Sequence, residues 1–444
     1  MVILAGAILS GAFAPLSWWP LGLLAYAIAV RALARSRRPI VDSFLFGLTA
    51  HLLILSWSKT YVGVAPFVAL ALLQALFSIP LGLHVKMRAP LYLLPLTFLI
   101  AEWSRQRVPF GGFGWSNLGY SQASAPYSHL ASIGGVYLIS ALMIAVVVAR
   151  HALQWALVLG LLIPSLLLSN PSGGEELTAA AIQGGHVERT ADFYTDIRKV
   201  FARHVNLTKS APPVDVIVWP ENVVDGSPVN REFSPIFSTL KGRELVIGAT
   251  PMVKGSPENQ SVHISETGKV KSIYRKQALV PFGEYVPFRS LVQHLNSHVD
   301  EVTDFRPGDE LVLHSIKGKS IAALICFEIV DDSIVREAAL RSAGVFSQTN
   351  SATFAKSAAA RQQFEITRIR SIEFSRPFIS ASTVGITGFI DNNGRVIKSL
   401  DEGVQGALIG KIELSQHRTI YAQFPYLSLI FSLLFAAAGR LRRS

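Results

Sequence analysis

Apolar positions are distributed unevenly along the chain. Long apolar runs with short polar breaks fill residues 1–169 and return at 423–439, whereas residues 175–420 mix apolar and polar positions as globular domains do. The runs predict membrane-spanning helices near 2–16, 20–35, 42–57, 63–84, 89–104, 128–150, 152–169 and 423–439. The first two are short for a hydrocarbon core about 30 Å thick. We therefore expect a membrane domain of seven helices over 1–169, a globular domain over 175–420, and a C-terminal transmembrane helix with a basic tail over 423–444.

Basic residues border the apolar runs and predict the topology. With the N-terminus inside the cell, ten Lys and Arg residues fall on the inner side: Arg31, Arg35, Arg37, Arg38, Lys86, Arg88, Arg150, Arg440, Arg442 and Arg443. Only Lys59, Arg105 and Arg107 fall in the short outer loops. The positive-inside rule then favours eight spans with both termini inside and residues 175–420 outside the cytoplasm, which in a bacterium means the periplasm. Residues 1–14 also resemble a signal peptide ending in Ala-Phe-Ala, but no basic residue precedes their apolar core.

The loop at 104–127 is rich in glycine and aromatic residues and poor in charge. Its ordinary interpretation is an interfacial connection, with Trp115 and Tyr120 anchored at the level of the lipid headgroups. A functional interpretation is a lid or lining over an entrance for lipid on the outer face. The sequence by itself leaves both open.

The globular segment alternates short apolar runs with amphipathic stretches. Buried strands are predicted at 214–219, 244–250, 320–327 and 345–350, and a helix at 359–376. The stretch Asp-Asn-Asn-Gly-Arg-Val-Ile at 391–397 predicts a turn followed by an extended segment, as in a hairpin. Strands that alternate with helices indicate a layered α/β domain.

Polar residues follow several of these strands. Glu221 comes just after the first, and the proline-containing stretch 274–288 holds Lys276 and Glu284. Cys326, the only cysteine of the chain, ends the run Ser-Ile-Ala-Ala-Leu-Ile-Cys. Taken singly, a carboxylate after a strand is usually solvated and a lone buried cysteine usually acts as a small apolar residue.

Taken together, these residues form a coherent nucleophilic site. A cysteine attacks as its thiolate and needs a base or a cationic neighbour to become one. Glu221 can take the thiol proton, and Lys276 can stabilise the thiolate and the oxyanion of a tetrahedral intermediate. A single cysteine excludes an internal disulfide and a cysteine-rich zinc site, and the eleven histidines show no ligand spacing. We expect no metal and no cofactor.

Three segments, in this order and after a multispan N-terminus, resemble the nitrilase (carbon–nitrogen hydrolase) superfamily: Trp-Pro-Glu-Asn at 219–222, Tyr-Arg-Lys-Gln-Ala-Leu-Val-Pro-Phe-Gly-Glu-Tyr-Val-Pro-Phe at 274–288, and Ile-Cys-Phe-Glu-Ile-Val at 325–330. More narrowly they are similar to its membrane branch, the bacterial apolipoprotein N-acyltransferases. The loop and span at 111–140 and the segments 361–379 and 384–396 extend the similarity over nearly the whole chain.

The resemblance implies an αββα nitrilase-like sandwich on a membrane domain of about eight helices. It implies that Glu221 is the general base, Lys276 the oxyanion-stabilising lysine and Cys326 the nucleophile, with Glu284, Glu328, Phe327 and Trp115 supporting the site or binding substrate. The implied reaction moves an acyl chain from a phospholipid, through a thioester on Cys326, to the α-amine of a diacylglyceryl-cysteine lipoprotein. The implied location is the bacterial inner membrane, with the catalytic domain on the periplasmic side.

Departures from the family pattern leave the acceptor open. Phe193 and Tyr194 stand where a tryptophan is usual, Phe327 where tyrosine is common, and the segment Asn-Ser-Ala-Thr-Phe-Ala-Lys at 350–356 lacks an acidic residue and a tryptophan. One alternative is therefore a related acyltransferase or amidase of the TraB type that serves plasmid conjugal transfer. Another is a non-catalytic assembly protein that keeps the fold as a scaffold. Nucleic-acid binding is disfavoured, because the charge of +11 lies along membrane borders rather than in a stripe on the globular domain.

Overall fold

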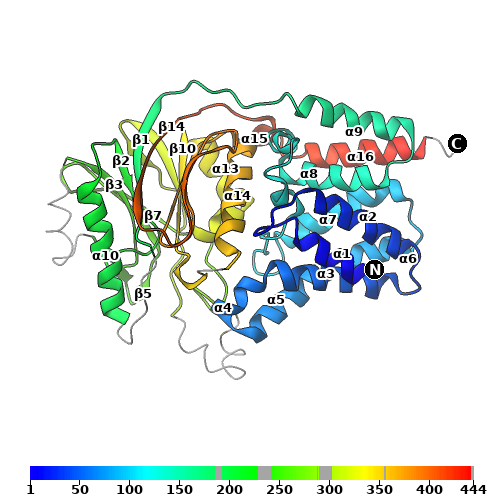
Figure 1. The fold of residues 1–444 in the computed structure, drawn as a ribbon, viewed down its shortest axis with the longest axis horizontal. Coiled ribbons are helices and arrows are strands. Elements are labelled where there is room, and N and C mark those ends of the chain that lie inside the picture. Colours follow the sequence, from blue (N-terminus) through cyan, green and yellow to red (C-terminus); the bar gives the residue numbers. More distant parts are fainter. Residues whose placement is uncertain (186–192, 229–241, 288, 290–302, 355–356, 442–444) are drawn as a thin grey trace. The chain divides into compact units, whose positions relative to one another are not determined.

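The computed structural model describes residues 1–185, 193–228, 242–287, 289, 303–354 and 357–441, and its backbone groups into two compact units. Unit 1 comprises Met1–Asn170, Ile372–Phe374 and Arg418–Ser444; unit 2 comprises Pro171–Ser371 and Ser375–His417. Figure 1 shows unit 1 as helices and unit 2 as strands with helices on both sides.

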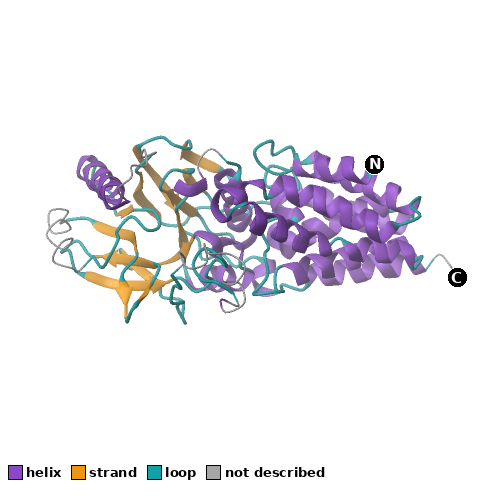
Figure 2. Cartoon of the chain, turned by 90° about the horizontal axis from the view of Figure 1, so that it is seen from below, coloured by secondary structure: helices purple, strands orange, loops and turns teal. Residues whose placement is uncertain are grey.

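Unit 1 is built from helices that run side by side (Figures 1 and 2). They are α1 (Val2–Ser10), α2 (Pro20–Ala34), α3 (Pro39–Ile54), α4 (Lys59–Val62), α5 (Val64–Leu76), α6 (Ile79–Lys86), α7 (Leu94–Arg105), α8 (Ala131–Val148), α9 (Ala152–Ser165), α15 (Ile420–Gln423) and α16 (Leu427–Arg440). In α8, Gly135 has φ +69°, and a Cβ there would lie 2.6 Å from the Tyr421 ring of α15. Only glycine therefore fits this kink.

The apolar runs fold as helices, but most are shorter than expected. Among the described residues, two helical stretches are long and apolar enough to cross a membrane, Val64–Lys86 and Ser128–Val148. Four shorter apolar helices, α2, α3, α9 and α16, have 10–17 residues each, and the run at 2–16 gives only the nine residues of α1. Prolines explain much of the shortening, because α2, α3, α6 and α7 each carry proline in the first turn, where its missing N–H costs least.

Unit 2 contains two six-stranded sheets and a small hairpin. The first sheet has the order β14 (Gly406–Glu413), β1 (Glu176–Gln183), β2 (Val216–Val218), β3 (Glu244–Ala249), β6 (Gln260–Ile264) and β7 (Val270–Arg275). The second has the order β13 (Val396–Leu400), β12 (Thr387–Ile390), β11 (Phe378–Ser382), β10 (Gly344–Thr349), β9 (Lys319–Ile325) and β8 (His314–Ile316). The hairpin joins β4 (Met252–Val253) and β5 (Ser256–Pro257). In each sheet three strands pair in parallel and antiparallel strands flank them.

The two sheets pack face to face, and helices cover their outer faces. Val216 and Val218 of the first sheet share a core with Phe346 and Ile379 of the second. Helix α10 (Phe193–Ser210) buries Phe201 in a second core on the outer face of the first sheet. Helices α13 (Asp332–Arg341) and α14 (Ala359–Phe374) lie against the second sheet (Figure 1). The result is the αββα nitrilase-like sandwich that the resemblance implies.

The four strands predicted from apolar runs are β2, β3, β9 and β10, and their residues are buried except at the start of β9. The predicted helix is α14, which ends at Phe374, and the predicted hairpin joins β12 to β13. One boundary was wrong: β9 stops at Ile325, and Cys326 begins a 3₁₀ turn over Cys326–Val330. The strand ends there because Cys326 has φ +52°, which is incompatible with an extended backbone.

Candidate active site

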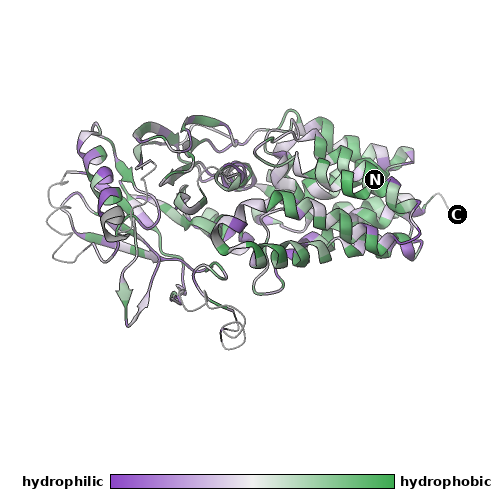
Figure 3. Ribbon diagram, turned by 60° about the horizontal axis from the view of Figure 1, so that its bottom comes forward, coloured by the Kyte–Doolittle hydropathy of each residue, from purple (hydrophilic) through white to green (hydrophobic). Residues whose placement is uncertain are grey.

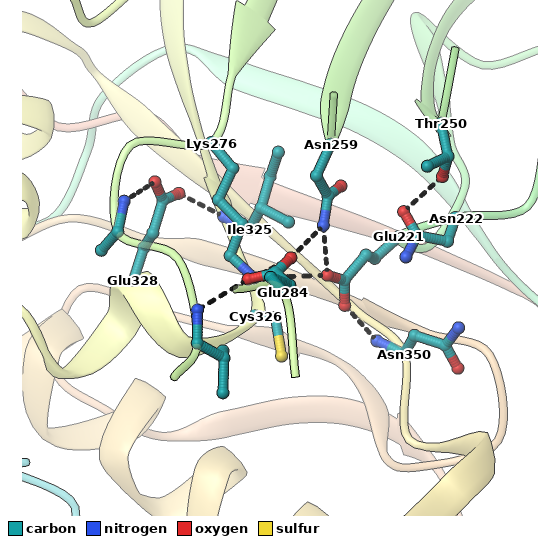
Figure 4. A network of polar contacts seen from close by, with 12 residues as sticks. Glu221, Asn222, Thr250, Asn259, Lys276, Glu284, Ile325, Cys326, Glu328 and Asn350 are labelled. Atoms are coloured by element: carbon teal, nitrogen blue, oxygen red, sulfur yellow. Dashed lines mark hydrogen bonds and ion pairs between the residues drawn. The ribbon is translucent and has the colours of Figure 1, made fainter. Parts of the chain in front are cut away.

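The structure brings together, within unit 2, five side chains that the sequence singled out. Glu221 follows β2, Lys276 follows β7, and Cys326 and Glu328 lie in the turn after β9. Glu284 lies in the proline-containing loop that follows Lys276. Figure 4 shows Glu221, Glu284, Lys276 and the sulfur of Cys326 converging between the ends of these strands.

Lys276 is enclosed by two carboxylates. Its side chain is 1% exposed, and its Nζ lies 2.8 Å from Glu284 Oε2, 2.9 Å from Glu284 Oε1 and 3.6 Å from Glu221 Oε1. Burial by itself would lower the pKa of this lysine, but Glu284 and Glu221 more than offset burial and raise its pKa above the ordinary value. Lys276 is therefore a fixed positive charge at neutral pH.

Glu221 is held by groups that leave it directed at the thiol. Its Oε1 accepts a hydrogen bond of 2.7 Å from Asn259 Nδ2, and its Oε2 accepts one of 2.8 Å from the backbone N–H of Asn350. Figure 4 shows the Cys326 sulfur on the same side of the site as this carboxylate. Burial raises the pKa of Glu221, and the charge of Lys276 opposes the rise. A buried carboxylate of raised pKa beside a thiol is suited to take its proton.

Asn259 was missed by the sequence analysis. It immediately precedes β6, and its Nδ2 bridges Glu221 Oε1 at 2.7 Å and Glu284 Oε1 at 2.9 Å. Two carboxylates that share a neighbourhood repel, and a shared amide donor together with the lysine holds them in place. The signal lay in the segment Pro-Glu-Asn-Gln at 257–260, which places polar residues at the start of a buried strand.

Cys326 is partly exposed, and its thiol lies beside charged side chains (Figure 4). Burial and the carboxylate of Glu221 raise the pKa of the thiol, and Lys276 works in the opposite direction. The resting group is therefore a thiol rather than a thiolate at neutral pH.

Glu328 performs a different task from the other glutamates. Its carboxylate is fully buried and accepts from four donors: the N–H groups of Ile325 (2.8 Å), Gln277 (2.7 Å) and Ala278 (3.3 Å) and the hydroxyl of Tyr274 (2.8 Å). Burial raises its pKa to about 7, against the effect of these hydrogen bonds. Because its partners are the residue before Cys326 and the residues just after Lys276, Glu328 joins the two segments that carry the nucleophile and the cation.

Three residues at the site have left-handed backbone. Asn222 directly follows Glu221 and has φ +55°, Phe282 lies two residues before Glu284 and has φ +63°, and Cys326 itself has φ +52°. A bulky residue with positive φ carries strain that surrounding contacts must sustain, and such residues gather at functional sites. Each of these turns directs the neighbouring polar side chain toward the others.

The remaining predicted residues lie elsewhere or are only partly described. Phe327 is half-buried in the turn that begins at Cys326, whereas Trp115 belongs to unit 1. The Trp115 ring is 5% exposed and its centroid lies 4.9 Å from that of Trp57, and Tyr120 is 2% exposed. Both rings are packed inside unit 1, which their interpretation as anchors at the headgroup level did not predict. The side chains of residues 193–197 and residues 355–356 lie outside the described part of the chain.

A buried ion pair fixes the segment around Trp115. Arg105 Nη2 donates to Glu102 Oε1 at 2.5 Å, and Arg105 Nη1 donates to Ser116 Oγ at 2.9 Å. Glu102 Oε2 accepts from the N–H of Leu118 at 3.2 Å. Arg105, assigned from its position to an outer loop, is therefore 3% exposed and ties this loop to the end of α7.

The described residues contain no group of three His, Cys, Asp or Glu side chains arranged to hold a metal ion. The arrangement at Cys326 places a thiol near a buried carboxylate and a fixed cation. Acyl transfer through a thioester can use groups of these three kinds.

Comparisons with known proteins agree with both units. The model of the apolipoprotein N-acyltransferase N-terminal domain matches residues 5–149, and that of carbon-nitrogen hydrolase matches residues 178–421. A protein from Pseudomonas putida named apolipoprotein N-acyltransferase is 30% identical over 100% of this chain and 97% of its own. One of the same name from Pseudomonas paraeruginosa is 29% identical over 96% of this chain and 91% of its own. Among solved structures, Saccharomyces cerevisiae Nit3, a member of branch 10 of the nitrilase superfamily, matches with a TM-score of 0.42 and 13% identity, over 55% of this chain and 92% of its own.

Proposed function

The chain belongs to the apolipoprotein N-acyltransferase family, and from this membership we propose that it is an acyltransferase that N-acylates lipoproteins with a fatty acid taken from a phospholipid. The observation that carries the proposal is the convergence of the Cys326 thiol, the buried carboxylate of Glu221 and the cation of Lys276, whose Nζ lies 3.6 Å from Glu221 Oε1 (Figure 4). The proposed donor is a phospholipid such as phosphatidylethanolamine, and the proposed acceptor is the free α-amine of a diacylglyceryl-cysteine.

In the first half-reaction, Cys326 Sγ attacks the ester carbonyl of the phospholipid while Glu221 takes the thiol proton. Lys276 Nζ stabilises the negative charge that develops on the carbonyl oxygen. The tetrahedral intermediate collapses by breaking the bond to the glycerol oxygen, which receives the proton held by Glu221. A thioester on Cys326 and a lysophospholipid result.

In the second half-reaction, the acceptor amine attacks the thioester carbonyl. Glu221 takes a proton from the attacking nitrogen, and the same lysine faces the new oxyanion. Collapse breaks the C–S bond, and the departing sulfur regains its proton from Glu221. An amide is formed and the thiol is restored, which is a ping-pong cycle.

Glu221 is a better candidate than Glu284 for this proton transfer. Both Glu284 oxygens lie within 2.9 Å of Lys276, and Oε2 also accepts from the N–H of Val280 at 2.8 Å. Glu284 is therefore occupied as the counter-ion of the lysine. Glu221 lies farther from the cation, at 3.6 Å, and after burial it raises the pKa of the Cys326 thiol more than Glu284 does.

Membrane embedding of unit 1 is part of the proposal. Its helices display large apolar side chains to their surroundings, among them Leu24 (47% exposed), Ile100 (55%) and Ile163 (59%). Figure 3 shows hydrophobic colour along much of the ribbon of these helices. An exposed apolar surface of this kind fits lipid better than water. We propose a domain over 1–169 and a helix at 423–444 that anchor a catalytic domain over 175–420 on the periplasmic face of the inner membrane, with up to eight spans.

Lipoprotein acylation is preferred to the conjugation alternative because full-length relatives bear the former name. A purely structural scaffold is disfavoured by the retention of Glu221, Lys276 and Cys326 in one cluster.

The test is mass spectrometry of the purified protein after incubation with phosphatidylethanolamine. We expect a hydroxylamine-labile acyl group on Cys326 of the native protein, and none on Cys326→Ala or Glu221→Gln. Addition of a diacylglyceryl-cysteine peptide should discharge the thioester and yield an N-acylated peptide. No adduct on the native protein would refute acyl transfer, and an adduct that the peptide fails to discharge would refute the lipoprotein acceptor.

A further inference from the structure

The backbone of the nucleophile is strained and needs support. Cys326 opens the 3₁₀ turn Cys326–Val330, here called the nucleophile turn, with φ +52°. An L-residue in this region brings its Cβ close to its own carbonyl oxygen, and the conformation persists only where surrounding contacts impose it. Glu328 supplies one such contact, through its hydrogen bond with the N–H of Ile325. The carbonyl side of Cys326 needs another.

Gln363 of α14 supplies that second contact. Its Nε2 donates to the carbonyl oxygen of Cys326 at 2.9 Å, and its side chain is 8% exposed. Because the peptide group is planar, fixing this carbonyl fixes the whole peptide plane between Cys326 and Phe327, and with it ψ of Cys326. Gln363 thus restrains ψ of Cys326, while Glu328 holds the peptide plane that precedes Ile325.

Arg370, on the same helix, holds the end of the nucleophile turn. Its side chain is fully buried, and Nε donates to the carbonyl of Ile329 at 2.9 Å, while Nη2 donates to the carbonyl of Val330 at 3.2 Å and to Asp332 Oδ1 at 2.6 Å. The last carbonyls of a helical turn have no partner inside it, and buried carbonyls require one. A guanidinium provides several donors in a rigid plane, so one side chain satisfies both carbonyls and a carboxylate.

Gln363 and Arg370 lie seven positions apart in α14, which is close to two helical turns. Side chains with this spacing project from the same face of a helix. The two residues therefore contact the beginning and the end of the nucleophile turn from one rigid element. The contacts are directed at main-chain carbonyls, where they control conformation, rather than at substrate.

We propose that Gln363 and Arg370 are positioning residues for acyl transfer, which together hold Cys326 in its left-handed conformation and so keep its sulfur against Glu221 and Lys276. The inference rests on the proposed function for the identity of the acyl donor. Loss of either contact lets the turn relax toward ordinary φ values, which moves Sγ away from the base. The thiol then loses reactivity while the binding of phospholipid is unaffected.

The main variant is Gln363→Leu, which removes the donor and keeps the size and burial of the side chain. We expect acylation of Cys326 at saturating phosphatidylethanolamine to slow about tenfold, which corresponds to about 1.4 kcal/mol. The KM for the phospholipid should stay within about twofold of the native value. Alkylation of Cys326 by iodoacetamide should slow to the same degree. The matched control is Glu365→Gln on the same helix, whose carboxylate pairs with Arg368 at 2.9 Å and should leave both rates unchanged.

Two further variants separate positioning from packing. Gln363→Glu places at this position a group that donates to the carbonyl only when protonated. The ratio of its alkylation rate to that of the native protein at the same pH should therefore be close to one in acid. The ratio should fall as the carboxyl ionises. Arg370→Lys keeps the charge but not the planar fork of donors, and should give an intermediate loss in alkylation rate. A role in packing alone would produce no such dependence on pH.

Alkylation and acylation rates of folded Gln363→Leu within twofold of the native rates would overturn the proposal. If Gln363→Leu does not fold, the relative pH profile of Gln363→Glu decides, and a flat profile refutes the inference. Alkylation by iodoacetamide needs no lipid, so it tests positioning independently of the proposed function. If the native protein forms no acyl adduct but is still alkylated faster than Gln363→Leu, the proposed function is refuted and the positioning role is supported.

Discussion

Replacement of Lys276 by methionine removes a buried charge while nearly keeping the volume of the side chain. The lysine is 1% exposed and its Nζ makes contacts of 2.8 and 2.9 Å with Glu284 and one of 3.6 Å with Glu221. Removal of one partner of a buried ion pair leaves uncompensated charge and costs about 3–5 kcal/mol. For a domain of this size about 1 kcal/mol corresponds to 2–4 °C, so the melting temperature should fall by roughly 6–20 °C.

The stability that Lys276→Met loses relative to the native protein should increase as the pH rises. Without the cation, the pKa of Glu221, already raised by burial, rises further, so the folded state holds a proton that the unfolded chain releases near pH 4.5. A carboxyl whose folded pKa is raised favours the folded state at low pH, and that contribution disappears as pH rises through the folded pKa. In the native protein, Lys276 is charged throughout this range because its pKa is also raised. The gap between native and Lys276→Met melting temperatures should therefore widen between pH 5 and pH 8.

The assay is thermal unfolding of the full-length protein in detergent, followed by tryptophan fluorescence at several pH values. Lys411→Met is the matched control. Lys411 of β14 pairs with Glu176 of β1 at 2.5 Å on the exposed side of the first sheet, where solvent screens the charge. This control should melt with the native protein at every pH. A Lys276→Met melting temperature equal to the native one, or a gap that does not change with pH, would show that the two carboxylates do not depend on this cation.

Three other substitutions test separate features. Cys326→Gly should be more stable than Cys326→Ala by about 1 kcal/mol in thermal unfolding, because glycine adopts φ +52° without strain; an alanine variant of equal stability would remove the argument for strain. Glu284→Gln should move the acidic limb of the acylation rate to lower pH, because the charge of Glu284 raises the pKa of Glu221; an unmoved limb would contradict that coupling. His314 is buried, and burial lowers its pKa to about 3, so the unfolded chain binds the extra proton below pH 6.5 and stability is lost as pH falls. The contribution of His314 should lower the unfolding free energy of the native protein by about 2 kcal/mol between pH 6.5 and pH 5. The unfolding free energy of His314→Gln should fall by that much less over the same range.

The elements of unit 2 with strong local signals were predictable, and their assembly was not. Four short runs rich in apolar residues predicted β2, β3, β9 and β10, and a helical period predicted α14. Local patterns carry no information on which sheet a strand joins, so the division into two sheets came from the resemblance alone. Strand β14 pairs with β1 across more than 220 residues of sequence, and no short-range signal specifies such a pairing.

The site shows the same division between local and distant information. Glu221, Lys276 and Cys326 were found because each follows a strand, and the ends of neighbouring strands meet in space. Asn259 and Gln363 make contacts that depend on the packing of β6 and α14 against other elements. The local sequence does not distinguish such an amide from any other amide in a polar stretch. The full burial of Arg370 was equally unpredictable, because arginine in an amphipathic helix normally faces solvent.

The two glutamates beside Lys276 are chemically identical, so geometry has to assign their tasks. Glu284 gives both of its oxygens to the cation and one to the N–H of Val280, which leaves it little freedom to accept and return a proton. Glu221 is fixed by an amide and a backbone N–H, both of which donate and neither of which can supply a positive charge. In the proposed reaction, this geometry makes Glu284 the counter-ion of Lys276 and leaves Glu221 to cycle between its charged and protonated states during both half-reactions.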